Sequence, residues 1–67
     1  NAVCPGLVDT EMIADLPDDQ RDFMIAATPL GRMATPEEIA NVVRFLMSDE
    51  ASYVNGAVVP IDGGLTA

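Results

Sequence analysis

Residues 35–48 carry the strongest structural signal in this chain, because they specify both where a helix begins and which face it buries. Thr35, Pro36 and Glu38 match a capping box, with the threonine as cap and proline at the first helical position. Apolar residues then recur at helical spacing at Ile39, Val42, Val43, Leu46 and Met47. We expect a final helix over residues 35–48 whose apolar stripe is buried core.

Two short apolar segments flank this helix. Residues 1–4 end at Pro5-Gly6, and residues 57–61 end at the turn-forming Asp62-Gly63-Gly64. Pro60 has no N–H for a ladder, so the last strand, 57–61, should pair on one side only. A strand, helices and a strand in this order predict a βαβ crossover with parallel strands, and therefore an α/β fold.

The segment from residue 11 to residue 28 has an interrupted helical pattern. Thr10 is placed to cap a short helix that runs through Ala14, and Pro17 is placed in the first turn of a second helix. Thr28 precedes Pro29, which disfavours helical geometry and should end the second helix. The sequence therefore predicts two helices between the first strand and the final helix.

Composition limits what the chain can do alone. It has 67 residues, 49% of them hydrophobic, no lysine or histidine and a net charge of −8. The negative charge argues against nucleic acid and membrane partners, and no metal-ligand spacing is visible. No disulfide or metal site is available to stabilise so short a chain, so the composition suits part of a larger core. The single Cys4 favours a reducing, cytoplasmic setting.

The loop from Pro5 to Thr10 is the candidate binding site. Ligands of open parallel sheets bind beyond the carboxyl ends of the strands, which is where Pro5 and Gly6 fall. A glycine there lets a flat ring approach, the next peptide can offer both N–H and C=O to a carboxamide, and Thr10 can offer a hydroxyl. An ordinary strand-to-helix turn capped by Thr10 is the alternative on these residues.

The chain resembles the short-chain dehydrogenase/reductase family from Asn1 to Gly64. The segments that carry the resemblance keep the family's order and spacing, and they are Asn1–Thr10, Pro29–Arg32, Pro36–Ala40, Phe45–Leu46 and Asp62–Gly64. The resemblance implies the C-terminal βαβ part of a Rossmann-like, doubly wound parallel sheet, with its last two strands, lid helices and final helix. We therefore expect the chain to be the C-terminal segment of a single domain.

The resemblance also implies roles for individual residues. Pro5 and Gly6 would lie by the nicotinamide of NAD or NADP, Val8 would hold the carboxamide through its backbone, and Thr10 would bond the carboxamide or pyrophosphate. Residues 11–28 would form a lid over the substrate. Four lid residues either line a hydrophobic substrate pocket or pack the lid on the body: Met12, Leu16, Phe23 and Met24.

The implied activity is hydride transfer between nicotinamide and a carbonyl or secondary alcohol, as in 3-oxoacyl-acyl-carrier-protein reductases or small alcohol dehydrogenases. The chain holds no catalytic residue: the family's glycine-rich loop, serine and Tyr-x-x-x-Lys pair fall outside it. Tyr53 is followed by no lysine, so we expect it to pack before the last strand. The isolated segment should be inactive.

Phe45 lies off the apolar stripe and predicts a second buried surface, at a subunit contact of a homo-oligomer, either a dimer or a tetramer. A rival interpretation is a truncated, non-catalytic self-association module. The coding sequence upstream of Asn1 separates the two. Cys4 should be an inert buried thiol, and Arg32 is either an ion-pair partner or a loop anchor.

Overall fold

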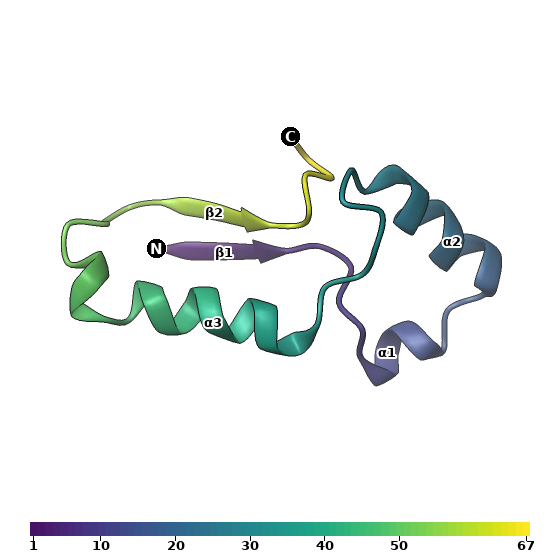
Figure 1. Ribbon diagram of the computed structural model, residues 1–67, viewed down its shortest axis with the longest axis horizontal. Helices are drawn as coiled ribbons and strands as arrows, with labels where there is room; N and C mark the ends of the chain where they lie inside the picture. The colour runs from purple at the N-terminus through teal and green to yellow at the C-terminus, as the bar shows by residue number, and fades with distance from the viewer.

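Two short strands lie side by side in the same direction, and the rest of the chain connects them (Figure 1). The computed structural model describes all residues 1–67. β1 (Ala2–Pro5) pairs in parallel with β2 (Val58–Ile61), with Ala2 opposite Val58 and Pro5 opposite Ile61. The connection runs through three α-helices and a 3-10 turn: α1 (Glu11–Ala14), α2 (Asp18–Ala27), α3 (Pro36–Leu46) and η1 (Asp49–Ala51). The predicted parallel βαβ unit is confirmed.

Helix α3 begins as the capping box predicts. The Glu38 N–H donates to Thr35 Oγ1 (3.2 Å), and the Thr35 N–H donates to Glu38 Oε1 (2.9 Å). The helix ends at Leu46, two residues before the expected bound, because Ser48 has extended geometry (φ −92°, ψ 165°) and starts η1. The Ser48 hydroxyl also donates to the Phe45 carbonyl. Local side-chain hydrogen bonds therefore define both ends of α3.

Replacing Thr35 with alanine removes the side-chain half of this capping box. We expect the intact protein to lose about 0.5–2 kcal/mol of unfolding free energy, the usual cost of an N-cap deletion. Thr35→Ser keeps the hydroxyl and should stay close to the original protein. Urea denaturation of the three proteins checks this, and equal midpoints for all of them would contradict it.

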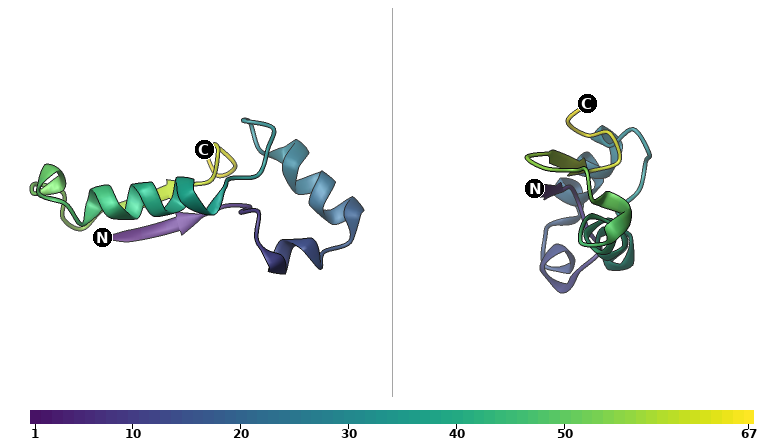
Figure 2. Two further views of the ribbon diagram at one scale, coloured as in Figure 1. Left: turned by 60° about the horizontal axis from the view of Figure 1, so that its bottom comes forward. Right: turned by 90° about the vertical axis from the view of Figure 1, so that its left-hand side faces the viewer.

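The sheet is covered on one face only. Helix α3 runs back along one side of the strands, and no element lies on the other (Figure 2). Val3, Val59 and Ile61 are half-buried, whereas the residues between them are exposed: Ala2, Cys4, Val58 and Pro60. Cys4 is thus not the buried thiol we expected, because the face of β1 that carries it has no layer above it.

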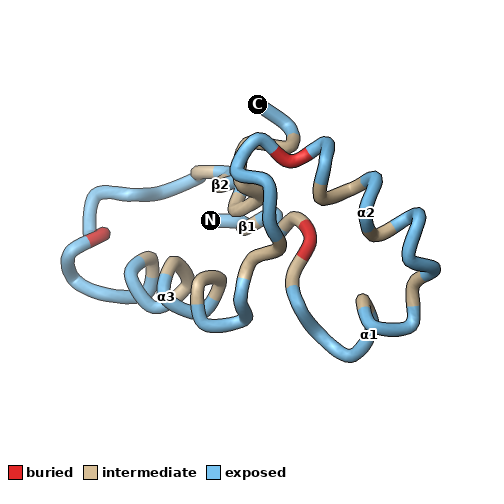
Figure 3. Tube along the Cα trace, turned by 45° about the vertical axis from the view of Figure 1, so that its right-hand side comes forward, coloured by how far each residue is buried: buried red, intermediate tan, exposed pale blue.

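Burial is sparse throughout the chain. Three residues are buried: Leu7 and Thr28 lie on one hollow near the ends of the strands, and Ala51 lies at the opposite end of the molecule (Figure 3). The first four residues of the α3 stripe are only half-buried, and Met47 is 83% exposed, so the expected core is incomplete. Two strands are too narrow to cover a three-turn helix. Tyr53 is fully exposed, which corrects its expected packing role.

Helices α1 and α2 project beyond the carboxyl ends of the strands (Figure 1). Pro17 is the N-cap of α2 rather than a first-turn residue, with φ −55° and ψ 143°. Thr28 ends α2 in extended geometry, as its position before Pro29 predicts. The Leu30 N–H then donates to the Gly63 carbonyl (3.2 Å), which connects the segment after α2 to the turn after β2. None of the helices has the length and apolar character needed to cross a membrane.

Pro60 lies within β2, but its lack of an N–H does not cost a hydrogen bond to β1. The carbonyls of Ala57 and Ile61 accept hydrogen bonds from the Ala2 and Gly6 N–H groups of the neighbouring chain segment (2.9 and 3.0 Å). Because backbone directions alternate along a strand, the backbone of Pro60 faces the opposite, unpaired edge. Pairing on one side is therefore as predicted, although the regular strand begins at Val58 rather than at residue 57.

Candidate functional site

The loop from Pro5 to Thr10 leaves the sheet at the carboxyl ends of both strands. Its first step is still tied to β2, because the Gly6 N–H donates to the Ile61 carbonyl (3.0 Å). Leu7 follows and is buried at 6% exposure. The loop therefore begins as a continuation of the sheet and is held in place before it turns toward α1.

Val8 is the residue whose backbone is best placed to bind a ligand. It forms a single parallel bridge with Ala34: the Ala34 N–H donates to the Leu7 carbonyl, and the Asp9 N–H donates to the Ala34 carbonyl, both at 2.9 Å. In this pattern the N–H and C=O of Val8 itself point away from Ala34. Neither group has a hydrogen-bond partner within the chain.

Thr10, two residues further along, has a hydroxyl without a hydrogen-bond partner in the chain. Its backbone carbonyl accepts from the N–H groups of Ile13 and Ala14 (3.1 and 3.2 Å), but its side chain makes no capping hydrogen bond. Thr10 is therefore the N-cap residue of α1, as the alternative for this loop expected, but its hydroxyl does not make the capping bond. The hydroxyl remains available to a ligand.

Gly6 is required by the chain itself. A Cβ at this position would lie 2.8 Å from both Cα and Cβ of Asp62, a distance too short for any side chain. We predicted that this glycine lets a flat ring approach the backbone. The structure adds a second requirement, because the backbone after β2 also approaches Gly6 closely. The neighbouring Pro5 is exposed.

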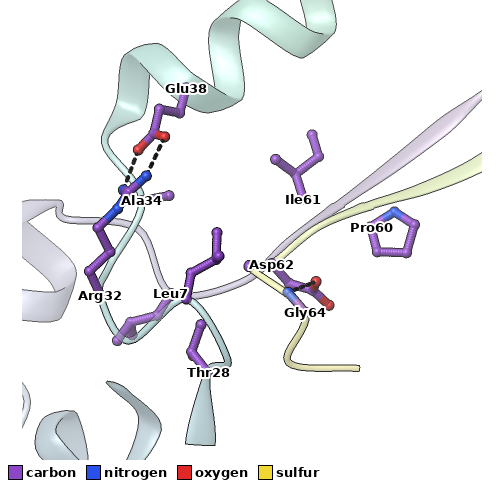
Figure 4. A pocket seen from close by; sticks show the side chains of 11 residues that line it. Leu7, Thr28, Arg32, Ala34, Glu38, Pro60, Ile61, Asp62 and Gly64 are labelled. Atoms are coloured by element: carbon purple, nitrogen blue, oxygen red, sulfur yellow. Dashed lines mark hydrogen bonds and ion pairs between the residues drawn. The ribbon is translucent and has the colours of Figure 1, made fainter. Parts of the chain in front are cut away.

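A charged cluster supports the segment that faces Val8. Arg32 Nη1 and Nη2 donate to Glu38 Oε1 and Oε2 (2.8 and 2.9 Å), and Nη1 also donates to the Met33 carbonyl (3.1 Å) (Figure 4). Arg32 is thus both an ion-pair partner and a loop anchor. Its guanidinium, helped by the Thr35 N–H, lowers the pKa of Glu38 from its ordinary 4.5 to about 2.

This low pKa predicts where the ion pair is lost. A carboxyl group with a depressed pKa in the folded protein stabilises the fold above its unfolded value, 4.5, and loses that contribution as the pH falls toward about 2. We expect an NMR titration of the Glu38 carboxyl to have its midpoint near 2, and Arg32→Ala to move it upward. An unshifted midpoint in the original protein would contradict the pair.

Beside this cluster is a hollow of about 230 Å³ between segment 28–34 and the end of β2 (Figure 4). Leu7 lines it, but the four expected cofactor residues do not. The sequence analysis proposed no functional role for two residues of its wall. Thr28 is buried with its hydroxyl donating to the Met24 carbonyl (2.8 Å), and Asp62 accepts from the Gly64 and Thr66 N–H groups. The hydroxyl of Thr66 also lowers the pKa of Asp62. The only sequence feature that pointed to Asp62 was the turn-forming Asp62-Gly63-Gly64.

Comparison with known proteins identifies the family. A family model described as enoyl-(acyl carrier protein) reductase matches residues 1–66, which is nearly the whole chain. The chain belongs to the short-chain dehydrogenase/reductase family. The resemblance inferred from the five sequence segments is thereby confirmed.

Individual relatives are similar over the same span. The chain is 54% identical over 65 residues (97% of its length) to a 3-oxoacyl-acyl-carrier-protein reductase from Pseudomonas aeruginosa, and 54% identical over all 67 residues to a cis-4-hydroxycyclohexanecarboxylate dehydrogenase from Sinomonas cyclohexanicum. A solved 3-oxoacyl-acyl-carrier-protein reductase from Brucella melitensis superposes on the whole chain with a TM-score of 0.95 at 36% identity. The chain covers 26%, 27% and 25% of these three proteins, so it spans about a quarter of their length.

Short-chain dehydrogenases/reductases share the Rossmann-like architecture that we expected, and the parallel strands with their crossover helix agree with an α/β segment of it. The bounds of the expected parts differ by a residue or two from the structure, as described above for α3 and β2. The expected lid, 11–28, corresponds to α1, α2 and the residues that join and end them.

The four residues expected in the lid do not line one common pocket within the chain. Phe23 and Met24 of α2 border a shallow hollow together with Asp19 and Gln20. Within the chain Met12 on α1 and Phe23 are exposed, and Leu16 between the helices and Met24 are half-buried.

Phe45 projects from the side of α3 and is 47% exposed. It borders a groove with Asn41 and Arg44 on the same helix and with Ser48, Asp49 and Glu50 beyond it. The chain covers only about half of this side chain, which is compatible with the predicted second surface but does not test it. No cluster of three or more His, Cys, Asp or Glu residues is arranged to hold a metal ion.

Proposed function

We propose that the protein containing this chain is an NAD(P)-dependent oxidoreductase that moves hydride between nicotinamide and a carbonyl or secondary alcohol. In this proposal the chain supplies the nicotinamide end of the cofactor site and the lid over the substrate. The nicotinamide cofactor accepts or donates the hydride, and the chain's own residues bind and orient it. The family membership of residues 1–66 supports this assignment.

The observation that carries the proposal is the unpaired peptide of Val8. A carboxamide has one oxygen acceptor and one NH₂ donor, and Val8 offers an N–H and a C=O on the side away from Ala34. Both groups lie where open parallel sheets bind ligands. Pro5 and Gly6 would flank the ring through their backbone, and the Thr10 hydroxyl would reach the carboxamide or pyrophosphate.

The names of the relatives support a substrate class rather than one substrate. A 3-oxoacyl-acyl-carrier-protein reductase and a hydroxycyclohexanecarboxylate dehydrogenase are equally identical to the chain. Their named reactions interconvert a ketone and a secondary alcohol. We propose that Met12, Leu16, Phe23 and Met24 form the apolar side of the substrate pocket once the body of the protein covers them.

The proposal assigns no catalytic residue to the chain. A proton donor and the groups that activate it would come from elsewhere in the intact protein, since the chain has neither lysine nor histidine and Tyr53 is fully exposed after η1, beyond the C-terminal end of α3. We further propose a homo-oligomer that uses Phe45. The lone Cys4 supports a cytoplasmic location.

Thr10→Ala in the intact protein tests the proposed cofactor site. Loss of the hydroxyl should weaken binding of NADH or NADPH by about 0.5–1.5 kcal/mol, the net contribution of one hydrogen bond. Thr10→Ser retains the hydroxyl and should bind like the original. Fluorescence titration of each protein with NADH and with NADPH measures this. If neither nucleotide binds, or if Thr10→Ala binds both as tightly as before, the proposed function is wrong.

A further inference from the structure

One bridge determines where the Val8 peptide points, and it depends on a loop. Ala34 is the partner of Val8, but Ala34 lies in no strand and is followed at once by the N-cap of α3. Gly31, which precedes this segment, has φ +74° and no atom near its missing side chain. Apart from the two hydrogen bonds of the bridge itself, the backbone N–H and C=O groups of Arg32 and Met33 have no backbone partner, so side chains provide the rest of the support for segment 32–35.

A single carboxylate supplies that support. Glu38 Oε1 accepts from Arg32 Nη1 (2.8 Å) and from the Thr35 N–H (2.9 Å), while Oε2 accepts from Arg32 Nη2 (2.9 Å). Arg32 Nη1 also donates to the Met33 carbonyl (3.1 Å). The residues on both sides of Ala34 are therefore fixed to the first turn of α3 through one side chain.

We propose that Glu38, together with Arg32, is a positioning residue for the cofactor: by fixing segment 32–35 it holds Ala34 against the loop and keeps the Val8 N–H and C=O directed at the nicotinamide carboxamide. This inference rests on the proposed function. It adds to that proposal two residues that do not touch the cofactor themselves.

The exposure of the pair favours positioning over stability. Both side chains are about half exposed, at 55% and 42%, and solvent-exposed ion pairs add little to folding. A bidentate guanidinium–carboxylate pair nevertheless restricts orientation strongly. Its loss should therefore change the direction of the Val8 peptide more than it changes the stability of the fold.

The test compares NADH with ADP-ribose, which lacks the nicotinamide ring and its carboxamide. In the intact protein, Arg32→Ala and Glu38→Ala should weaken NADH roughly two- to tenfold, the range of one misaligned hydrogen bond. Both variants should bind ADP-ribose like the original protein. Calorimetric titration of the original protein and the two variants with each compound gives the six dissociation constants, and NADPH replaces NADH if the protein prefers it.

Two control variants separate positioning from general damage. Glu37→Ala removes the neighbouring carboxylate of the same helical turn, which has no hydrogen-bond partner, and should bind both compounds normally. Thr35→Ala lowers stability through the cap but leaves the Arg32–Glu38 pair, and should also bind NADH normally.

Three results would overturn the inference. The first is unchanged NADH binding in Arg32→Ala and Glu38→Ala. The second is an equal loss of NADH and ADP-ribose, which would mean a merely structural role. The third is a loss of NADH binding in Thr35→Ala as large as in Glu38→Ala. If the original protein binds NADH and Thr10→Ala weakens it while Glu38→Ala does not, only this inference fails and the proposed function stands.

Discussion

Gly6→Ala should lower the unfolding free energy of the intact protein by about 1–3 kcal/mol, the usual cost of forcing a methyl group into occupied space. The new Cβ would lie 2.8 Å from Cα and Cβ of Asp62. The closest of these atoms belongs to the backbone, so no side-chain rotation relieves the overlap. Valine at this position should be worse than alanine, because a branched side chain adds two more carbons. Thermal or urea unfolding measures the loss.

The control for Gly6→Ala is a glycine with open space around it. A Cβ at Gly56 meets no atom within 4 Å, but its φ of +76° is unfavourable for alanine. Gly56→Asn should therefore be nearly neutral, since asparagine tolerates this region. Unchanged stability in Gly6→Ala would show that β2 and the loop can move apart freely, and that position 6 is constrained by a ligand instead.

Phe45→Glu should dissociate a subunit contact of the intact protein. The ring is half exposed on α3, and its groove already contains the carboxylates of Asp49 and Glu50. Arg44 is the one cation on this groove, so a third carboxylate in an interface between copies would leave an excess of negative charge removed from water, which is costly. Because a two-fold contact brings the same patch from both copies together, each substitution acts twice.

Light scattering decides the outcome for Phe45. A reduced mass for Phe45→Glu, with the original mass for Phe45→Leu, agrees with a contact at this helix. Binding of NADH should persist in both variants, because Phe45 lies at the end of α3 away from the Val8 loop (Figure 1). An unchanged mass for the glutamate variant places any interface elsewhere.

The parts of the fold that depend on neighbouring residues were predictable from the sequence. The capping box at Thr35 and Glu38, the end of α2 at Thr28 and the one-sided pairing of β2 all follow from local chemistry and match the structure. Family membership was also predictable, because several short segments kept a specific order although each alone was weak.

Burial was the property that the sequence predicted poorly. Cys4, Met47 and Tyr53 read as packed residues because they are apolar or aromatic and flank regular elements, yet all three are exposed. Whether such a side chain is covered depends on distant parts of a protein. A pattern within a few residues carries no such information.

The candidate site was half predictable for the same reason. The loop itself follows from a strand that ends in Pro5-Gly6. The bridge from Val8 to Ala34 and the partner of Arg32 could not be found, because they join segments that no periodicity connects. The close approach of Asp62 to Gly6 could not be predicted either, since Asp62 lies far away in sequence.

Pro60 has a consequence for how copies of this fold can meet. Its backbone faces the free edge of β2, where it supplies no hydrogen-bond donor, so the row of donors along that edge is interrupted in a strand of only four residues. A further strand would lack one of its regular hydrogen bonds there, which disfavours aggregation by edge-to-edge pairing of copies. Extension of the sheet by a further regular strand is therefore favoured beyond β1, and a contact between copies along the β2 edge would depend more on side chains than on backbone pairing.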